Sequence, residues 1–355
     1  METVFVAMSG GFDSSFAAYL LKEKGYNVVG VTFELLGKHA PLIESLYCSH
    51  SNHAVARAQG VARYLSIPHY VLDLSQEFET HVIHPFIDEY KSGNTPNPCI
   101  LCNRSVKFSS FAKKAFSMGA DKLATGHYAI IEEIDGDYCL KKGADGYKDQ
   151  SYFLYSVDKS ILKNTLFPLG PYTKKDLRER ARNLSWNIHM IEESQDICFI
   201  PDNDYGDFLS RHIAPRAGPI YHTDGTFLGN HRGLYFYTIG QRKGINIPYG
   251  TPLYVVDIIP DENLIIVGGK EELLCTSLTA SKVNMFSHAS LNVSGKVRYR
   301  QKAEACTYEM EGDSLRVQFA TPISSVTPGQ SVVLYHGDRV IGGGIIKTRG
   351  RQANQ

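Results

Sequence analysis

The chain lacks an excess of charge of either sign, because its 37 lysine and arginine residues balance 37 aspartate and glutamate residues over 355 positions. This balance excludes a uniformly basic protein that coats nucleic acid, so any nucleic-acid site must be a local basic patch. No apolar run approaches the roughly 20 residues that a membrane span needs, and the apolar stretch at the N-terminus is too short for a signal peptide. We therefore expect a cytoplasmic protein with no membrane partner.

Cysteine is scarce, with seven residues scattered over a long chain. An odd, dispersed set does not look like a disulfide framework, so any cysteine chemistry should be catalytic or metal-binding. Apolar sequence is present in ordinary amounts: 43% of the residues are hydrophobic, which is enough to bury a sizeable core and excludes disorder as the main state. At a typical domain size of about 150 residues, the length predicts two to three domains.

The first third of the chain alternates β-branched runs with amphipathic stretches, which is typical of a parallel sheet wrapped by helices. The pattern predicts strands at 3–8, 28–33, 69–72 and 122–125, and helices at 14–24, 55–65 and 174–184. After about Asp204 the pattern changes to turns and short strands, with a hairpin signal where DENL separates VVDII from IIVGG. From Ser281 onward the short strands predict a compact all-β unit, a small barrel. We expect an α/β domain, a small mixed domain and a β-barrel, in that order.

A glycine loop, SGGFDSS at 9–15, follows the first strand and opens the first helix. Backbone N–H groups and the helix dipole converge there, which favours a bound phosphate. The loop lacks the lysine of a Walker motif, so cleavage between the α and β phosphates of ATP is more natural than γ-phosphate hydrolysis. Asp13 would hold Mg²⁺ against the phosphates. The alternative is a purely structural role, in which the glycines only allow the chain to turn after the strand. The strand–SGGxDS–helix arrangement instead resembles the PP-loop ATP pyrophosphatase superfamily, whose members adenylate a carbonyl or carboxylate oxygen.

Cys99 and Cys102 form a C-x-x-C motif within TPNPCILCNRSVKF. We expect both thiols at the end of a rigid loop, just before a helix that starts near Asn103, where a thiol pKa is lowered. Cys198, in SQDICFI, is far from both in the sequence and can lie near them only if the tertiary fold brings it there. Three such thiols can serve as a redox pair with a partner, an incomplete zinc site or three ligands of an iron–sulfur cluster, and Cys198 alone can equally be a core thiol. The other cysteines show no partner spacing and are expected to be core or surface thiols: Cys48, Cys139, Cys275 and Cys306.

The order of motifs narrows the resemblance. SGGFDSS, TPNPCILCNRSVKF, ATGHYA, KDQSYFLY, ESQDICFI, YTIGQRKG, VRYRQ, TPGQS and GGGIIK run from Ser9 to Lys347 in the order found in the tRNA-specific 2-thiouridylases. The resemblance implies an α/β PP-loop (adenine nucleotide alpha hydrolase-like) domain with a parallel sheet over 1–204. It further implies a small mixed, tRNA-binding central domain over 205–278 and a C-terminal β-barrel over 279–355.

The resemblance also implies the reaction: ATP adenylates the C2 oxygen of the wobble uridine in tRNA, AMP and pyrophosphate are released, and sulfur replaces the oxygen to give 2-thiouridine. The expected partners are tRNAs for Lys, Glu and Gln, and a sulfur donor or carrier protein that stays open. Alternatives are the same reaction class on another tRNA base and a PP-loop amidating ligase. A non-catalytic RNA-binding protein is disfavoured because the glycine loop is intact.

Residue roles carry over from the family position by position. ATP contacts fall on Ala7, Met8, Ser9, Gly10, Gly11, Phe12, Asp13, Ser14, Phe33 and Gly126. Contacts with the target base or the tRNA fall on Asn97, Pro98, Cys99, His127, Lys148, Asp149, Gln150, Arg298, Tyr299 and Gln330. Arg298 and Tyr299 in VRYRQ offer charge and an aromatic face on an expected strand, suited to RNA, although an ordinary solvated strand has the same pattern.

The catalytic residues that the resemblance implies are Asp13, Cys102 and Cys198. In one version Cys198 carries a persulfide, and Cys102 releases sulfide from it or closes a disulfide with it. Many family members have Asp at the position of Cys99. The C-x-x-C found here matches the subgroup proposed to hold a 4Fe-4S cluster, so Cys99, Cys102 and Cys198 are the expected metal ligands, and the persulfide relay is the alternative.

Overall fold

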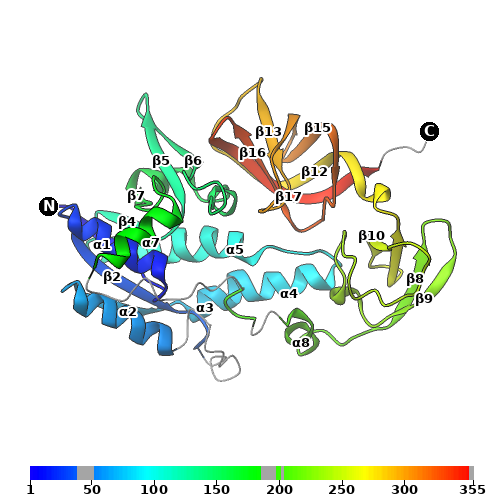
Figure 1. The fold of residues 1–355 in the computed structure, drawn as a ribbon, viewed down its shortest axis with the longest axis horizontal. Helices are drawn as coiled ribbons and strands as arrows, with labels where there is room; N and C mark the ends of the chain where they lie inside the picture. Colours follow the sequence, from blue (N-terminus) through cyan, green and yellow to red (C-terminus); the bar gives the residue numbers. More distant parts are fainter. Residues whose placement is uncertain (38–51, 185–196, 201–203, 352–355) are drawn as a thin grey trace. The chain divides into compact units, whose positions relative to one another are not determined.

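The computed structural model describes residues 1–37, 52–184, 197–200 and 204–351, which form two compact units (Figure 1). The first unit comprises Met1–Ile83, Pro98–Asn203 and Asp338–Val340, and the second comprises His84–Asn97, Asp204–Gly337 and Ile341–Gln355. Cys48 lies outside the described residues. Within the described ranges, no helix combines the length and the apolar content needed to cross a bilayer.

A five-stranded parallel sheet forms the centre of the first unit, in the order β3-β2-β1-β4-β7. The strands are β1 (Thr3–Ala7), β2 (Asn27–Glu34), β3 (His69–Asp73), β4 (Lys122–Thr125) and β7 (Thr165–Leu166). Four of them confirm the strands expected from the β-branched runs. The α/β fold class is therefore confirmed.

The strand order decides which face each helix covers. Because β1, β2 and β3 follow one another in one direction, right-handed connections place α1 (Phe12–Glu23) and α2 (Asn52–Tyr64) on the same face. Val4 and Val6 of β1 pack there against both helices. The chain then returns past β1 to β4, and its helices cover the other face, where Phe33 of β2 meets Phe111 at 4.8 Å between ring centroids. The carboxyl ends of β1 and β4 flank the point where the strand order reverses, and open α/β sheets bind ligands at such a point.

The long connection from β3 to β4 is almost entirely helical. Its segments are α3 (Ser75–Phe78), a π-helix (Glu79–Ile83), α4 (His84–Lys91), α5 (Pro98–Leu101), a second π-helix (Cys102–Ser110) and α6 (Phe111–Ser117). Crossovers between parallel strands are usually α-helical, so two π-helical segments in one crossover are unusual. π-Helical turns within helices are frequent at functional sites.

Two further elements complete the first unit. A hairpin of β5 (Ala129–Ile134) and β6 (Asp137–Lys142) follows β4, and its turn residues Asp135 and Gly136 both have positive φ. Helix α7 (Lys174–Arg182) begins at a capping box made by Thr173 and Asp176 and packs on α1 through Leu177.

The second unit contains two all-β parts, helix α4 and the short helix α8 (Tyr205–Ser210). One part is a four-stranded sheet of order β10-β11-β8-β9, from β8 (Gly218–His222), β9 (Phe227–His231), β10 (Tyr254–Ile259) and β11 (Leu264–Gly268). The antiparallel pairing of β10 with β11 confirms the predicted hairpin.

The other part is a closed barrel, because β12 pairs with both β15 and β17. Its strands are β12 (Leu274–Met285), β13 (Val293–Lys296), β14 (Glu304–Glu311), β15 (Ser314–Ser324), β16 (Ser331–His336) and β17 (Arg339–Arg351). Cys275 and Cys306 are buried in the barrel core, as expected for core thiols. The predicted C-terminal barrel is confirmed.

Candidate active site

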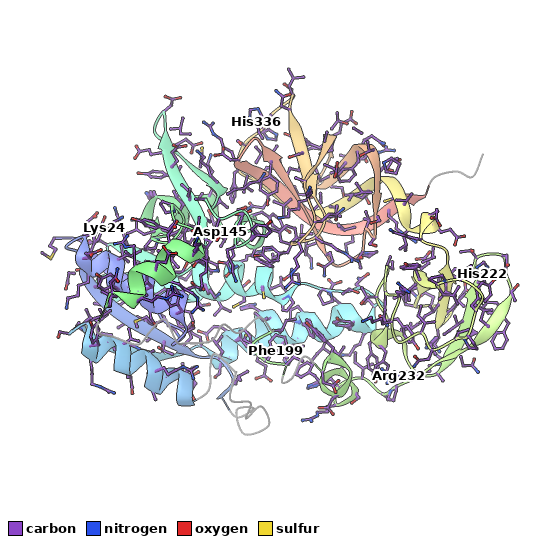
Figure 2. The ribbon with its side chains drawn as sticks, in the orientation of Figure 1. Lys24, Asp145, Phe199, His222, Arg232 and His336 are labelled. Atoms are coloured by element: carbon purple, nitrogen blue, oxygen red, sulfur yellow. The ribbon has the colours of Figure 1, made fainter. Side chains whose placement is uncertain are left out.

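A cavity of about 290 Å³ lies at the carboxyl ends of β1 and β4. Among the residues that line it are members of all three predicted groups: Ala7, Met8, Ser9, Asp13, Ser14, Phe33 and Gly126 for ATP, Pro98, Cys99, His127 and Gln150 for tRNA, and Cys102 and Cys198 for sulfur. Sequence reasoning missed the other lining residues: Phe78, Val82, Lys107, Thr125, Ile197 and Phe199. Phe199, labelled in Figure 2, meets Phe78 edge to face at 5.6 Å between ring centroids. The topological switch point thus holds one compartment lined by the glycine loop and three thiols.

The glycine loop is held by its own serines. The Ser14 hydroxyl accepts a hydrogen bond from the Ser9 backbone N–H at 3.0 Å and donates to the Gly11 carbonyl at 3.3 Å. Gly11 is the N-cap of α1, and no side chain caps that end of the helix. An uncapped helix start that faces a cavity is suited to an anion, because its first N–H groups and the dipole favour negative charge.

At two positions only glycine fits, because the backbone of another segment lies too close for a Cβ atom. Gly10 has φ +71°, and a Cβ there would lie 2.4 Å from the Ala54 carbonyl oxygen. A Cβ on Gly126, after β4, would lie 2.7 Å from the carbonyl carbon of Asp13 and the nitrogen of Ser14. The chain after β4 is therefore packed directly on the glycine loop.

This close packing makes Gly126 a sensitive probe of the loop. We expect Gly126→Ala to push the Asp13–Ser14 backbone out of place and to lower kcat/KM for ATP by about 100-fold, the order expected for a displacement of about 1 Å. Steady-state kinetics measures this, with Gly250→Ala as the control for loss of a glycine, since nothing lies within 4 Å of a Cβ at Gly250 and its φ is not in the left-handed region. A Gly126→Ala enzyme with unchanged ATP kinetics would contradict the assignment of this loop to ATP.

Asp13 takes part in an ion pair that the sequence did not indicate. Its Oδ1 accepts hydrogen bonds from the Lys174 ammonium at 2.6 Å and from the Tyr128 hydroxyl at 2.7 Å. The Lys174 ammonium also lies 4.4 Å from the centroid of the Phe12 ring. The Lys174 backbone N–H donates to Asp145, which Figure 2 labels in the first unit, at 2.9 Å. Phe12, predicted to contact ATP, lies beside this ion pair, and neither it nor Gly10 and Gly11 is among the lining residues.

The thiols of the C-x-x-C motif lie inside a helical stretch, so the expectation of a loop ending near Asn103 is wrong. Pro98 opens α5, where a proline costs no intrahelical hydrogen bond, and Cys99 follows within the same turn. Cys102 begins the π-helix Cys102–Ser110. Two prolines disfavour helix before the motif, but nothing in the sequence delays the helix start beyond the second proline.

The expected lowering of the thiol pKa values is also wrong. Burial raises the pKa of the Cys99 thiol to about 11, and it raises the pKa of Cys102 as well. The positive charge of Lys107 opposes both shifts. Cys99 is exposed and lines the cavity. Desolvation therefore outweighs any benefit of the helix N-terminus.

His127 lies in an apolar wall of the cavity and is 9% exposed. Its Nδ1 shares a hydrogen bond of 2.7 Å with the Thr125 hydroxyl, and its ring packs against Phe108 and Phe167. Burial, helped by the Lys107 charge, holds the pKa of His127 well below its usual value. The side chain is therefore a neutral imidazole, which can accept or donate a hydrogen bond but brings no charge to an RNA backbone.

Of the three predicted tRNA residues after β6, Lys148, Asp149 and Gln150, only Gln150 lines the cavity. Gln150 lines the cavity, and its Oε1 accepts a hydrogen bond from the Tyr128 N–H at 3.0 Å. Asp149 is buried, and its carboxylate accepts hydrogen bonds from Gly143 and Ser151. Lys148 is half-buried and does not line the cavity. Asp149 thus stabilises the loop that presents Gln150.

Four predicted tRNA residues belong to the second unit: Asn97, Arg298, Tyr299 and Gln330. Arg298 and Tyr299 lie in a turn after β13, so their expected place on a strand is wrong. The Arg298 guanidinium donates to the Ile239 carbonyl at 2.8 Å and to the Thr327 hydroxyl at 2.5 Å. Gln330 donates to the Thr95 carbonyl at 2.7 Å. Both side chains therefore also stabilise the second unit.

Three cysteines share the cavity, but they are not arranged as a ready ligand set. Across the described ranges, no three His, Cys, Asp or Glu side chains are grouped closely enough to hold a metal ion. Cys139, in β6, is half-buried and is absent from the lining of the cavity.

Three family models match consecutive parts of the chain. They are described as a tRNA methyl transferase HUP domain over residues 2–202, a tRNA methyl transferase PRC-barrel domain over 206–269, and an aminomethyltransferase beta-barrel domain over 275–346. Their order follows the α/β unit, the four-stranded sheet and the closed barrel.

Similar curated proteins cover the chain almost from end to end. The tRNA-specific 2-thiouridylase MnmA of Halothermothrix orenii is 45% identical over 357 residues, and MnmA of Acetivibrio thermocellus is 46% identical over 358 residues. MnmA 2 of Clostridium tetani is 45% identical over 353 residues. Each alignment covers 98% of this chain and 99% of the relative.

Proposed function

Because the chain belongs to the tRNA-specific 2-thiouridylase family, we propose that it uses ATP to replace the C2 oxygen of the wobble uridine in tRNA with sulfur. The glycine loop binds ATP, the C2 oxygen is adenylated with release of pyrophosphate, and AMP leaves as sulfur arrives. A cytoplasmic location and tRNAs for Lys, Glu and Gln as substrates are parts of this proposal.

The observation that carries the proposal is the shared cavity. A loop suited to phosphate, a neutral histidine and three thiols line one compartment of about 290 Å³. Adenylation needs the uracil and ATP held together, and sulfur transfer needs the thiols at the same carbon. The descriptions of two family models name methyl transfer, a reaction for which a phosphate loop and three cavity thiols have no evident use.

Different residues of the cavity bind the phosphates of ATP and the uracil of the tRNA. The backbone of Ser9–Ser14 holds the phosphates, and Asp13, fixed by Lys174 and Tyr128, keeps the start of α1 in place. Pro98, Cys99, His127 and Gln150 surround the uracil. The base must leave its stack to reach them, as bases do in other enzymes that modify them. Asn97 stays a predicted contact to the target base. The predicted contacts to the rest of the tRNA stay Lys148, Asp149, Arg298, Tyr299 and Gln330.

Mg²⁺ does not fit Oδ1 of Asp13, because an ammonium and a hydroxyl already lie within hydrogen-bond distance of that atom. In this proposal Mg²⁺ accompanies ATP as the counterion of its phosphates, and Asp13 has a positioning role.

The chemistry of the donor set suits an iron–sulfur cluster, since thiolates are its usual protein ligands and three thiols line one cavity, although the described residues do not group them closely enough to hold it without a rearrangement. Cys99, Cys102 and Cys198 would hold a 4Fe-4S cluster. When bound, such a cluster leaves one iron without a protein ligand, and this iron can hold the sulfide that is to be transferred.

A persulfide relay is the second candidate, because Cys102 and Cys198 line the cavity whether or not Cys99 is a ligand. Cys198 would carry the persulfide, and Cys102 would release sulfide from it or close a disulfide with it. The sulfur donor or carrier protein would then load Cys198.

Metal analysis separates these two candidates. For protein purified and reconstituted without oxygen, we expect about four iron atoms and four sulfides per chain, lost in Cys99→Ala and retained in Cys139→Ala. Iron and acid-labile sulfide assays measure this. Negligible iron together with full thiolation by Cys99→Ala would contradict the cluster and leave the relay.

The proposed domain boundaries are 1–204, 205–278 and 279–355, supported by the spans of the three family models. The function itself is tested by incubating undermodified tRNA with the protein, ATP, Mg²⁺ and sulfide, and by analysing the nucleosides by mass spectrometry. We expect 2-thiouridine at the wobble position, dependent on ATP. Its absence with an intact, reconstituted enzyme would refute the proposal, and 2-thiocytidine or an amidated product would support the alternative reactions.

A further inference from the structure

Lys107 is the one lysine or arginine among the described residues that line the cavity. Asp13 is already paired with Lys174, and burial keeps His127 neutral. The described lining therefore holds one side-chain cation that is not assigned to Asp13. The reaction proposed above brings two anions to this compartment, the incoming sulfur and the departing AMP phosphate.

The helix type brings Lys107 to the thiols. Lys107 follows Cys102 by five residues, and in an α-helix five residues turn well away from the starting face. The segment Cys102–Ser110 is a π-helix, in which i→i+5 bonds close each turn. The Phe111 N–H accordingly bonds to the Val106 carbonyl, and the Ser110 hydroxyl donates to the Ser105 carbonyl at 3.1 Å. Lys107 thus lies about one turn above Cys102, and both line the cavity.

The cavity lining places Lys107 in the same compartment as the thiols. Lys107 lines it together with Cys99, Cys102 and His127, which come from two different parts of the chain. The glycine loop, in contrast, binds anions through backbone groups and the end of α1. The cavity therefore has two separate means of stabilising negative charge, one at the loop and one beside the thiols.

We propose that Lys107 is a further catalytic residue, whose ammonium stabilises the anionic sulfur as it attacks the activated uridine. This inference rests on the proposed function. With hydrosulfide as the nucleophile, a sulfur lone pair forms the C2–S bond, and the C2–O bond then breaks with its electron pair leaving on AMP. The sulfur's proton passes to N3 of the uracil, which lost its own proton during adenylation. No oxidant or reductant is required.

The test separates adenylation from sulfur transfer in single-turnover reactions of the reconstituted enzyme with tRNA, ATP and inorganic sulfide. Pyrophosphate release reports adenylation, and 2-thiouridine reports transfer. For Lys107→Met we expect transfer to slow by about 100-fold or more, as for the loss of one donor to a developing charge, with pyrophosphate release and tRNA affinity within about 3-fold of wild type. Lys107→Arg should regain at least about 10-fold of the loss, because it restores the charge.

Lys113→Met is the matched control, since Lys113 is exposed on α6 and does not line the cavity. If Lys107→Met does not fold, Lys107→Gln, which has a polar side chain, replaces it. The same slowing of sulfur transfer is expected for that variant. Equal losses in pyrophosphate release and transfer, or wild-type transfer by Lys107→Met, would overturn the assignment. If the wild-type enzyme forms no 2-thiouridine, the proposed function fails as well. If wild type and Lys107→Met form 2-thiouridine at the same rate, only the inference about Lys107 fails.

Discussion

Cys198→Ser is expected to abolish 2-thiouridine formation, with a loss on the order of 10³-fold or more, which corresponds to more than about 4 kcal/mol at the transition state. Cys198 lines the same cavity as Cys99 and Cys102, and it is required both as a cluster ligand and as a persulfide carrier. Serine keeps the size of the side chain but is neither a soft iron ligand nor able to carry a persulfide. Pyrophosphate release should persist, because the glycine loop is untouched.

Cys139→Ser is the control for this experiment, since Cys139 is a half-buried thiol of β6 that does not line the cavity. It should thiolate tRNA at the wild-type rate. Thiolation by Cys198→Ser within about 10-fold of wild type, a loss of less than about 1.4 kcal/mol, would remove Cys198 from the sulfur path.

Asp13→Ala should lower AMP and pyrophosphate formation by at least about 100-fold while tRNA affinity stays within about 3-fold, on the general size of effects from displaced catalytic groups. The carboxylate joins Lys174 and Tyr128 to the start of α1. Without it, the Lys174 ammonium, whose side chain is 10% exposed, loses its ion-pair partner beside the loop that binds ATP. Product release and filter binding of tRNA measure the two effects.

Asp137→Ala is the matched control for Asp13→Ala. Asp137 also pairs with a lysine, Lys159, at 2.6 Å, but it lies on the exposed β5–β6 hairpin. We expect normal AMP release from this variant, since exposed ion pairs contribute little to stability. Equal loss of tRNA binding and AMP release in Asp13→Ala would mean that Asp13 is needed for the fold and has no particular part in adenylation.

The sequence predicted the parallel sheet and the glycine loop because both depend on local patterns. β-Branched runs form β1 to β4, and SGGFDSS follows β1 and opens α1 as expected. The β5–β6 hairpin was not predicted, although its Asp135-Gly136 turn carries a known hairpin signal, D-G between two strands.

Other features of the site had no local signal. The pairing of Asp13 with Lys174 joins residues 161 positions apart, so only the packing of α7 on α1 brings them together. Lys107 had no such signal either, because an α-helix would turn it away from Cys102 and no sequence rule indicates the π-helix. The raised pKa values of Cys99 and Cys102 follow from burial, which spacing and helix position do not report.

The most direct test of the account follows the uridine oxygen itself. A tRNA transcribed with ¹⁸O at C2 of uracil is incubated with the enzyme, ATP and sulfide, and the AMP and nucleosides are analysed by mass spectrometry. Adenylation of the C2 oxygen predicts one ¹⁸O in AMP for each 2-thiouridine formed, with pyrophosphate unlabelled. 2-Thiouridine accompanied by unlabelled AMP would contradict the account, because the oxygen would then have left without being adenylated.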